Sequence, residues 1–485
     1  MLDSPIFPVA AGLGLLLGGY CFFRSLRWET GLKQLVIILC FGGIVSVNLG
    51  SGSYAIIFRD AFIVLPLYIG FVNSAEGQQA LKYLPTDISA ILVLFLTVIF
   101  ICVFASPFVN VATLLIGLKV WLFYIPFLAV GVALATRPEL LVRFFRTILL
   151  WGFAAAAIGL VQSLLVRLVG YQQVMEWFFG ANAIKVTQDF TVFDVAGGIY
   201  RIPGTFSFVS QYANFLYLYL IVAIIETHIE PDSLYRQIAQ IGVVLALVAG
   251  LLCGARQQIL LFPATMMIFA LGGLLSRRLL VIAPVAVVVG GAIIAVSGLD
   301  LVQYFFVGRD LAGEYSENFV GRELLSGLDF GVLGGGIGTS TTAARYALGF
   351  TTDATSAVGL ESYYGKAGAE LGWFGFDAIA LLMAVVMLRA IVSVLQNFTR
   401  RSHAVVAPVA VFLAYIVVSS FKGSPLDTDP GNIFFWLFLG VLVGVSRFGF
   451  ALDPLIQPDE DPVYSEEDAV GDEGAASVSW DAPGE

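Results

Sequence analysis

The chain has 485 residues, of which 59% are hydrophobic and 12% are charged, and its formal net charge is −10. Soluble globular domains carry about 25% charged residues, so this composition excludes an ordinary soluble protein and indicates a membrane protein. No basic cluster marks a nucleic-acid surface. The four cysteines lie inside apolar runs without metal-ligand spacing, which favours packing over disulfide or redox roles; they are Cys21, Cys40, Cys102 and Cys253.

Apolar runs long enough to cross a bilayer recur along the chain. A hydrocarbon core needs about 20 helical residues, and these runs lack the strict alternation of an outer-membrane barrel. The sequence therefore predicts an all-α, polytopic transmembrane helical bundle of about 12–13 spans. In chain order, we expect them at residues 6–23, 34–50, 54–72, 88–105, 109–135, 147–169, 206–227, 237–253, 258–275, 279–297, 367–395, 404–420 and 431–447.

The spans and the polar segments between them divide the chain into six parts. Residues 1–169 hold the N-terminal spans, 170–205 form an outer loop, 206–297 hold further spans, 298–366 form a large outer loop between the tenth and eleventh spans, 367–447 hold the last spans, and 448–485 form a tail. The tail is rich in acidic residues and has no Lys or Arg, so we expect it to be disordered.

Basic residues in the short loops predict the orientation. Lys and Arg gather in the first, fifth, seventh, ninth and eleventh loops, which the positive-inside rule places in the cytoplasm together with the tail. The two large polar loops, the turn at 254–257 and the loop 421–430 then share the outer face.

Three arginines stand out on that outer face, where the same rule should deplete them. Arg201 precedes the seventh span, Arg256 lies between the eighth and ninth, and Arg322 lies in the large loop. A guanidinium matches phosphate oxygens in a bidentate way, so the group predicts a site for an anionic ligand. The alternative is that each arginine reaches lipid phosphates or pairs with acids in the loops.

Other polar residues give weaker signals. Lys119 and Asp377 are ionisable residues inside spans, which suggests a functional pair or cavity, and Glu370 should share a helix face with Asp377. The run 334–339 is rich in glycine and predicts unusual backbone angles or close approach to a ligand. Asp427-Thr428-Asp429 has the composition of a carboxylate metal site, but nothing else supports one and we expect no metal.

These residues resemble the O-antigen polymerase and ligase family of membrane glycosyltransferases. In that family a GR step, a GxG segment and an acid/base position precede a helix that opens with ELGxxG; upstream stand an R-x-x-G-x-F segment and a short (S/A)R turn. The corresponding segments are Gly321-Arg322-Glu323, residues 333–339, Glu361-Ser362-Tyr363-Tyr364, Glu370-Leu371-Gly372-Trp373-Phe374-Gly375, Arg201-Ile202-Pro203-Gly204-Thr205-Phe206 and Gly254-Ala255-Arg256. The resemblance covers residues 195–450 in order and spacing.

The resemblance implies transfer of a glycan from an undecaprenyl diphosphate carrier to a sugar hydroxyl, at the outer face of the bacterial cytoplasmic membrane. Arg201 and Arg256 would then hold the diphosphate, Arg322 would be a third contact or loop anchor, and Glu361 would be the general base. Lys119, Asp377 and Tyr363 would line a cavity, and no cofactor is expected. The expected partners are the undecaprenyl-diphosphate-linked oligosaccharide, membrane lipid, and flippase and chain-length regulator proteins, with no nucleic acid.

Three alternatives remain open. Ligases of the family usually show a His-Asn pair where this chain has Glu361-Ser362, a departure that favours a polymerase over an O-antigen ligase. A lipid-linked oligosaccharide flippase would have ionisable or broken helices near the membrane midplane and two similar halves. A non-catalytic scaffold would bind its partners through the acidic tail.

Overall fold

The computed structural model describes residues 6–48, 52–106, 110–180, 194–195, 199–296, 326–341 and 362–449. Within these ranges the regular secondary structure is helical apart from a short antiparallel pair, β1 (Asp194–Val195) with β2 (Ile199–Tyr200). Nine helical segments of this described part are long and apolar enough to cross a membrane. The fold is therefore that of a polytopic helical bundle, and the total of 12–13 spans stays a prediction.

Helices coincide with every predicted span. A π-helical turn, Asp60–Val64, joins α3 to α4, so that these two form one span, as α7 and α8 also do. Short 3-10 turns lie at Leu81–Tyr83 and Ser326–Phe330. The helices are α1 (Ile6–Ser25), α2 (Trp28–Asn48), α3 (Gly52–Arg59), α4 (Leu65–Val72), α5 (Ala75–Ala80), α6 (Thr86–Ala105), α7 (Val111–Leu122), α8 (Phe127–Ala135), α9 (Pro138–Val169), α10 (Tyr171–Phe179), α12 (Val209–Ile229), α13 (Ser233–Leu252), α14 (Arg256–Leu271), α15 (Arg277–Val296), α19 (Tyr363–Asn397), α20 (His403–Ser419) and α21 (Gly431–Phe448).

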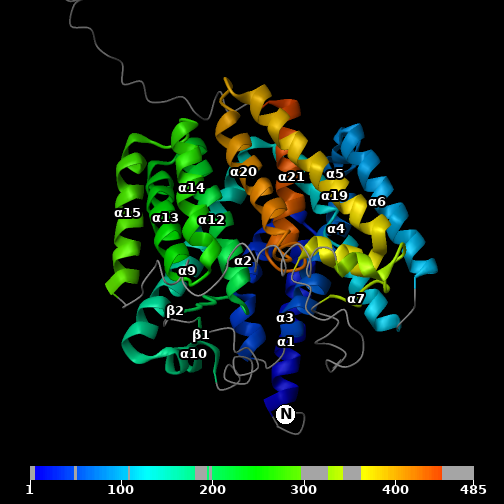
Figure 1. The fold of residues 1–485 in the computed structure, drawn as a ribbon, viewed down its shortest axis with the longest axis horizontal. Helices are drawn as coiled ribbons and strands as arrows, with labels where there is room; N and C mark the ends of the chain where they lie inside the picture. Colours follow the sequence, from blue (N-terminus) through cyan, green and yellow to red (C-terminus); the bar gives the residue numbers. More distant parts are fainter. Residues whose placement is uncertain are drawn as a thin grey trace, which may run out of the picture.

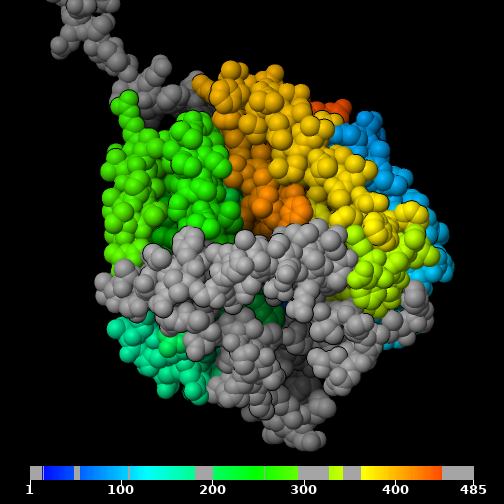
Figure 2. Space-filling view, in the orientation of Figure 1, coloured from blue at the N-terminus to red at the C-terminus, as the bar shows by residue number. Residues whose placement is uncertain are grey.

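Two helices form the centre of the bundle. The apolar window of α12 is 94% buried and that of α21 is 83% buried, whereas the other long spans bury between 39% and 50%. An apolar helix that is buried all round has no lipid-facing side, so α12 and α21 are interior helices. Figure 1 shows α12 to α15 on one side of the α20–α21 pair and α6 with the long part of α19 on the other. The same order of green, orange and yellow helices is visible on the surface in Figure 2.

Glycines allow α8 and α21 to pack backbone against backbone. A Cβ atom on Gly131 would lie 2.0 Å from the Leu437 carbonyl oxygen, and one on Gly440 would lie 2.0 Å from the Leu128 carbonyl oxygen. Small residues are the usual means by which membrane helices come this close. The contact fixes the position of α7, which precedes α8, relative to the loop that precedes α21.

Side-chain contacts sort the loops into two faces. At one end of the bundle, Arg137 pairs with Glu29 at 2.7 Å and with Glu76 at 3.2 Å, which joins the first, third and fifth loops. At the same end His228 Nε2 lies 2.6 Å from the Leu274 carbonyl oxygen, which joins the seventh and ninth loops. We call this end the basic face. Odd-numbered loops therefore meet each other, as the Lys and Arg pattern predicts.

The opposite end, which we call the site face, joins the even-numbered loops. The Asn48 amide donates to the Phe178 carbonyl oxygen at 3.3 Å, and the Ser106 hydroxyl donates to the Leu333 carbonyl oxygen at 2.6 Å. The start of α1 lies at this end together with α10 and the β1–β2 pair (Figure 1).

The helix α19 is broken near its start. Gly372 has φ 69° and ψ −161°, which is not helical, and the two pieces of α19 on either side run in different directions (Figure 1). The break leaves backbone groups without helical partners. Residues of the Gly-rich run and just before it form hydrogen bonds with these groups instead. The Gly335 N–H donates to the Ala369 carbonyl oxygen at 2.7 Å, and the Trp373 N–H donates to the Gly331 carbonyl oxygen at 3.2 Å.

This break corrects two of our expectations. The helix begins at Tyr363, inside the segment 298–366 that we predicted to be loop. Glu370 and Asp377 do not share a helix face, because the break lies between them: Glu370 is buried and Asp377 is exposed. The sequence indicated one continuous apolar helix, in which a single glycine gives no sign of a break.

Candidate functional site

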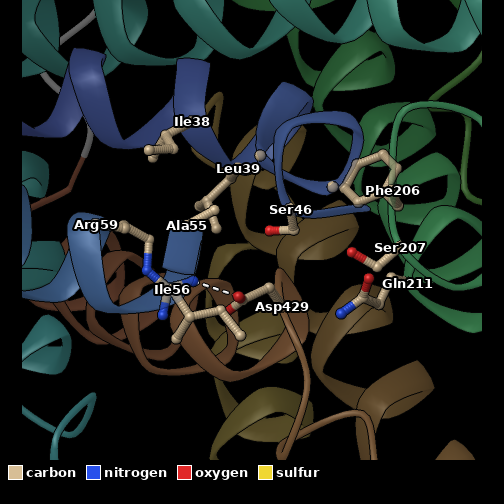
Figure 3. Close-up of a pocket in the computed structure, with 12 residues that line it drawn as sticks. Ile38, Leu39, Ser46, Ala55, Ile56, Arg59, Phe206, Ser207, Gln211 and Asp429 are labelled. Atoms are coloured by element: carbon tan, nitrogen blue, oxygen red, sulfur yellow. Dashed lines mark ion pairs between the residues drawn. The ribbon is translucent and has the colours of Figure 1, made fainter. Parts of the chain in front are cut away.

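A crevice on the site face lies between α2, α3, the segment before α12 and the loop before α21 (Figure 3). The space open to the centre of a water molecule is about 40 Å³, and one water needs about 10–15 Å³ of such space. The crevice thus holds about three water-sized groups. Its lining mixes apolar with polar side chains: Ile38, Leu39, Gly42, Gly43, Ser46, Ala55, Ile56, Arg59, Phe206, Ser207, Gln211 and Asp429.

Arg59 is the charged centre of this crevice. Its side chain is only 3% exposed, and its Nε donates to Asp60 Oδ1 at 2.8 Å. The same guanidinium pairs with Asp429 (Figure 3) and donates to the Tyr124 hydroxyl. On α7, Lys119 Nζ lies 2.5 Å from Asp60 Oδ2. The group holds two cations and two carboxylates, so its formal charge sums to zero.

The pairing of Lys119 with Asp377, which the sequence suggested, is therefore wrong. Lys119 pairs with Asp60 instead, which follows Arg59 at the π-helical turn. Such turns are frequent at functional sites. We missed Arg59 and Asp60 in the sequence although both lie within the predicted span 54–72, and an ionisable residue inside a span is itself a functional signal.

A second charged group lies where α19 begins. Lys366 is 1% exposed and pairs with Asp427, and its ammonium lies 4.8 Å from the centre of the Trp121 ring. Tyr363 is buried beside them, with its ring 5.3 Å from that of Trp121. Tyr363 thus packs among buried polar groups, and the cavity that we expected it to line stays a prediction.

Glu370 links the Gly-rich segment to the broken helix α19 by hydrogen bonds. Its Oε2 accepts from Trp121 Nε1 at 2.8 Å and from the Gly338 N–H at 2.9 Å, and its Oε1 accepts from the Ser340 N–H at 2.9 Å. A buried carboxylate is stable only with such donors. The side chain therefore holds α7, α19 and residues 338–340 together.

The glycines in this segment have the unusual backbone angles that the sequence predicted. Gly334, Gly336 and Gly338 have φ between 72° and 109°, a region that favours glycine. The backbone at Gly338 approaches another part of the protein closely, since a Cβ atom on Gly338 would lie 2.1 Å from the Thr113 carbonyl oxygen.

The carboxylates of the loop before α21 form ion pairs with basic side chains of the protein. Asp427 pairs with Lys366 and Asp429 pairs with Arg59. Within the described ranges no group of three or more His, Cys, Asp or Glu residues is placed to hold a metal ion. Metal binding by Asp427-Thr428-Asp429 thus has no further support.

The segment that begins with Arg201 is fixed against three neighbours. The Ile202 N–H donates to the Cys253 carbonyl oxygen at 2.9 Å, in the turn that leads to Arg256. The Gly204 carbonyl accepts from the Gln162 amide of α9 at 2.9 Å, and Thr205 accepts from a backbone N–H of α2. The segment ends at Phe206 and Ser207, which line the crevice.

Cys253 lies where this turn begins. Burial raises the pKa of the Cys253 thiol to about 12, and the positive charge of Arg201 acts in the opposite direction. Arg256 is the first residue of α14, and its side chain lies outside the described part of the structure. The structure thus brings the backbones that carry Arg201 and Arg256 into contact. Arg322 and Glu361 lie outside the described residues.

Together, the fold and this site define a polytopic helical membrane protein with charged residues buried near one face. Comparison of the chain with models of known protein families and with characterised proteins finds no match.

Proposed function

We propose that the protein polymerises a cell-surface polysaccharide, such as O-antigen or exopolysaccharide. It would transfer an undecaprenyl-diphosphate-linked glycan to a sugar hydroxyl at the outer face of the bacterial cytoplasmic membrane. One observation carries the proposal: the hydrogen bond from Ile202 to Cys253 joins the segment of Arg201 to the turn of Arg256. These are two of the motifs that resemble the glycosyltransferase family, and they are far apart in the sequence.

The chemistry explains why two arginines belong together. A diphosphate that leaves a sugar gains negative charge, and preorganised guanidinium groups stabilise that charge in the transition state without a metal ion. Arg59 cannot take this role in the present arrangement, because Asp60 and Asp429 already neutralise it. We therefore keep Arg201 and Arg256 as the diphosphate ligands, with Arg322 as a third contact.

The proposed base precedes α19 in the sequence. Glu361 directly precedes Ser362, which caps α19 by accepting from the Gly365 N–H at 3.2 Å. The next N–H, that of Tyr363, donates to the Ser420 carbonyl oxygen at 3.0 Å, beside the loop that carries Asp427 and Asp429. In the proposed reaction Glu361 takes the proton of the acceptor hydroxyl.

Lysine substitutions test the arginine assignment. Arg201→Lys and Arg256→Lys keep the charge but remove the guanidinium fork, so elongation of a lipid-linked oligosaccharide by the purified protein should slow by about 100-fold. Arg401→Lys, on the basic face, is the matched control and should elongate at the parental rate. Parental rates in both site variants would reject the proposal.

A second candidate function, transport of a lipid-linked oligosaccharide, is favoured by the break in α19 and by the buried ionisable residues around it. The lipid-linked product that accumulates in cells lacking the protein separates the candidates. If the missing protein is a polymerase, single repeat units accumulate on the outer side, and if it is a transporter, they accumulate on the cytoplasmic side. If it is an O-antigen ligase, polymer accumulates on the carrier lipid.

A further inference from the structure

The crevice beside Arg59 has a neutral lining rich in hydrogen-bonding groups. Ser46 comes from α2, Ser207 from the segment before α12 and Gln211 from α12 itself. Arg59 and Asp429 complete the polar part (Figure 3). Because Lys119 and Asp60 complete the charge balance around Arg59, the crevice has no excess positive charge. An anionic group such as a phosphate therefore gains little here, whereas a neutral polar group can both donate and accept.

An unused hydrogen-bond acceptor points to a ligand with a hydroxyl group. Asp429 Oδ2 pairs with Arg59, but its Oδ1 is buried and has no hydrogen-bond partner in the described structure. A buried carboxylate oxygen without a donor is costly, and such atoms call for an explanation such as a bound molecule. A hydroxyl group donates one hydrogen bond and accepts others, so it matches Asp429 together with Ser207 and Gln211.

The size of the crevice limits the ligand. A crevice that holds a few water-sized groups fits a hydroxyl or hydroxymethyl group. The ring would lie at the mouth of the crevice. Phe206 and Ser207, which line the crevice, follow Arg201 in the same segment of the chain.

We infer that this crevice is a specificity subsite, which binds a hydroxyl-bearing arm of a sugar through Asp429, Ser46, Ser207 and Gln211. The choice of a saccharide as the ligand rests on the proposed function. The subsite holds a neutral part of the substrate, while Arg201 and Arg256 hold the charged part. Sugars that lack a hydroxyl or hydroxymethyl group in the matching position leave Asp429 without its donor and bind less well.

A glycine substitution fills the crevice without removing any polar partner. Gly42 lines it, and a Cβ atom there would make ordinary contacts, 3.5 Å from Ile38 and 3.9 Å from Ala55. Gly42→Ala should therefore fold normally and exclude the ligand. Gly19→Ala, on α1, is the matched control, because a Cβ atom there would meet nothing within 4 Å.

Binding is measured by saturation-transfer NMR on the purified full-length protein in detergent, with the methyl glycosides of glucose, galactose and N-acetylglucosamine as probes. The unmodified protein and Gly19→Ala should bind at least one of them. Gly42→Ala should bind it about tenfold more weakly, which corresponds to about 1.4 kcal/mol. Asp429→Asn, which replaces an acceptor oxygen with an NH₂ group and keeps the shape of the side chain, should weaken the binding of the same glycoside.

Three results would overturn the inference. They are no binding of any of these glycosides by the unmodified protein, equal binding by Gly42→Ala and Gly19→Ala, and displacement of the glycoside by inorganic phosphate, which would make the crevice an anion site. The readout does not need catalysis. Glycoside binding in this crevice by a protein that transfers no glycan would support the subsite and reject the proposed polymerase.

Discussion

The Glu370 carboxylate is enclosed by N–H donors on both of its oxygens. In Glu370→Gln only one of the two side-chain atoms that replace the carboxylate oxygens is still a hydrogen-bond acceptor. The amide NH₂ then faces either the N–H of Ser340 or the N–H groups of Gly338 and Trp121, and these donors lose their acceptor. Leaving such buried donors unsatisfied should lower the free energy of unfolding by about 3 kcal/mol. Thermal unfolding in detergent measures the loss.

The control for this substitution is Asp377→Asn on the same helix. Asp377 is exposed, so its neutralisation should change stability by less than about 0.5 kcal/mol. Equal stability of the two variants would show that Glu370 does not hold the Gly-rich segment.

Cys253 should be unreactive in the folded protein. Burial raises the pKa of its thiol to about 12, so at pH 8 only about one molecule in 10,000 carries the reactive thiolate. A maleimide should label Cys253 only after the protein is denatured, as mass spectrometry of the labelled peptide would show. Rapid labelling of the folded protein at pH 8 would contradict both the burial and the raised pKa.

Sequence reasoning at the residue scale finds the chemical type of a residue better than its partner. It identified Lys119 as an ionisable residue inside a span, but its partner is Asp60 and not Asp377. Nothing local indicates which acid a lysine will meet when both lie within apolar runs. Arg59 and Asp60 could have been found from the same signal; the contact of Arg59 with Asp429 depends on how the helices pack.

The break in α19 makes a prediction for an element. Gly372 has positive φ, and a Cβ atom there would lie 2.2 Å from the Val332 carbonyl oxygen. Gly372→Ala should therefore destabilise the protein by about 3 kcal/mol, from backbone strain and from displacement of the Gly-rich segment. The fraction of protein that elutes as a monodisperse peak in size-exclusion chromatography measures this effect.

Gly291→Ala in α15 provides the comparison, because a Cβ atom at that position would meet nothing within 4 Å. This variant should elute like the parent protein. A normal profile for Gly372→Ala would mean that α19 can continue as a regular helix at this point.

Whole elements were largely predictable, because the length and hydropathy of a span are local properties. Each predicted span has its helix, and the unusual backbone of the Gly-rich run is present. The start of α19 at Tyr363 was not predicted. The polar residues up to Lys366 made residues 363–366 look like the end of the loop, whereas in the structure Asp427 and the Trp121 ring stabilise the Lys366 charge in a buried helix.

For the whole molecule, the two faces predict accessibility to a membrane-impermeant thiol reagent. In a cysteine-free background, Lys422→Cys on the site face should be labelled in intact spheroplasts. Lys82→Cys and Arg401→Cys on the basic face should be labelled only after the membrane is permeabilised, since the positive-inside rule places that face in the cytoplasm. All three positions are exposed, so a lack of labelling reports sidedness.

Labelling of Lys82→Cys and Arg401→Cys in intact spheroplasts, without labelling of Lys422→Cys, would reverse the orientation. The site face would then be cytoplasmic, and the proposed reaction at the outer surface would fail.

The grouping of loops into two faces was predictable, because it depends only on the order of the spans, and the Lys and Arg residues mark one of the two faces. Contacts such as those of Arg137 with Glu29 and Glu76 agree with it. The arrangement of helices around α12 and α21 was not predictable, since every span is apolar and the pattern that distinguishes an interior helix is weak. The crevice depends on that arrangement and was therefore missed.

The pairing of Arg59 with Asp429 has a consequence for the synthesis of the protein. Arg59 enters the membrane early in translation, together with Asp60 and Lys119, whereas Asp429 follows only when nearly all the spans have been made. During that interval Asp60 alone balances Arg59 and Lys119, so the group carries one excess positive charge. We expect membrane proteases to remove such incomplete chains faster, because an unbalanced charge is costly in lipid. A chain that ends at Phe421 should then have a shorter half-life in a pulse-chase experiment than one that ends at Gly449.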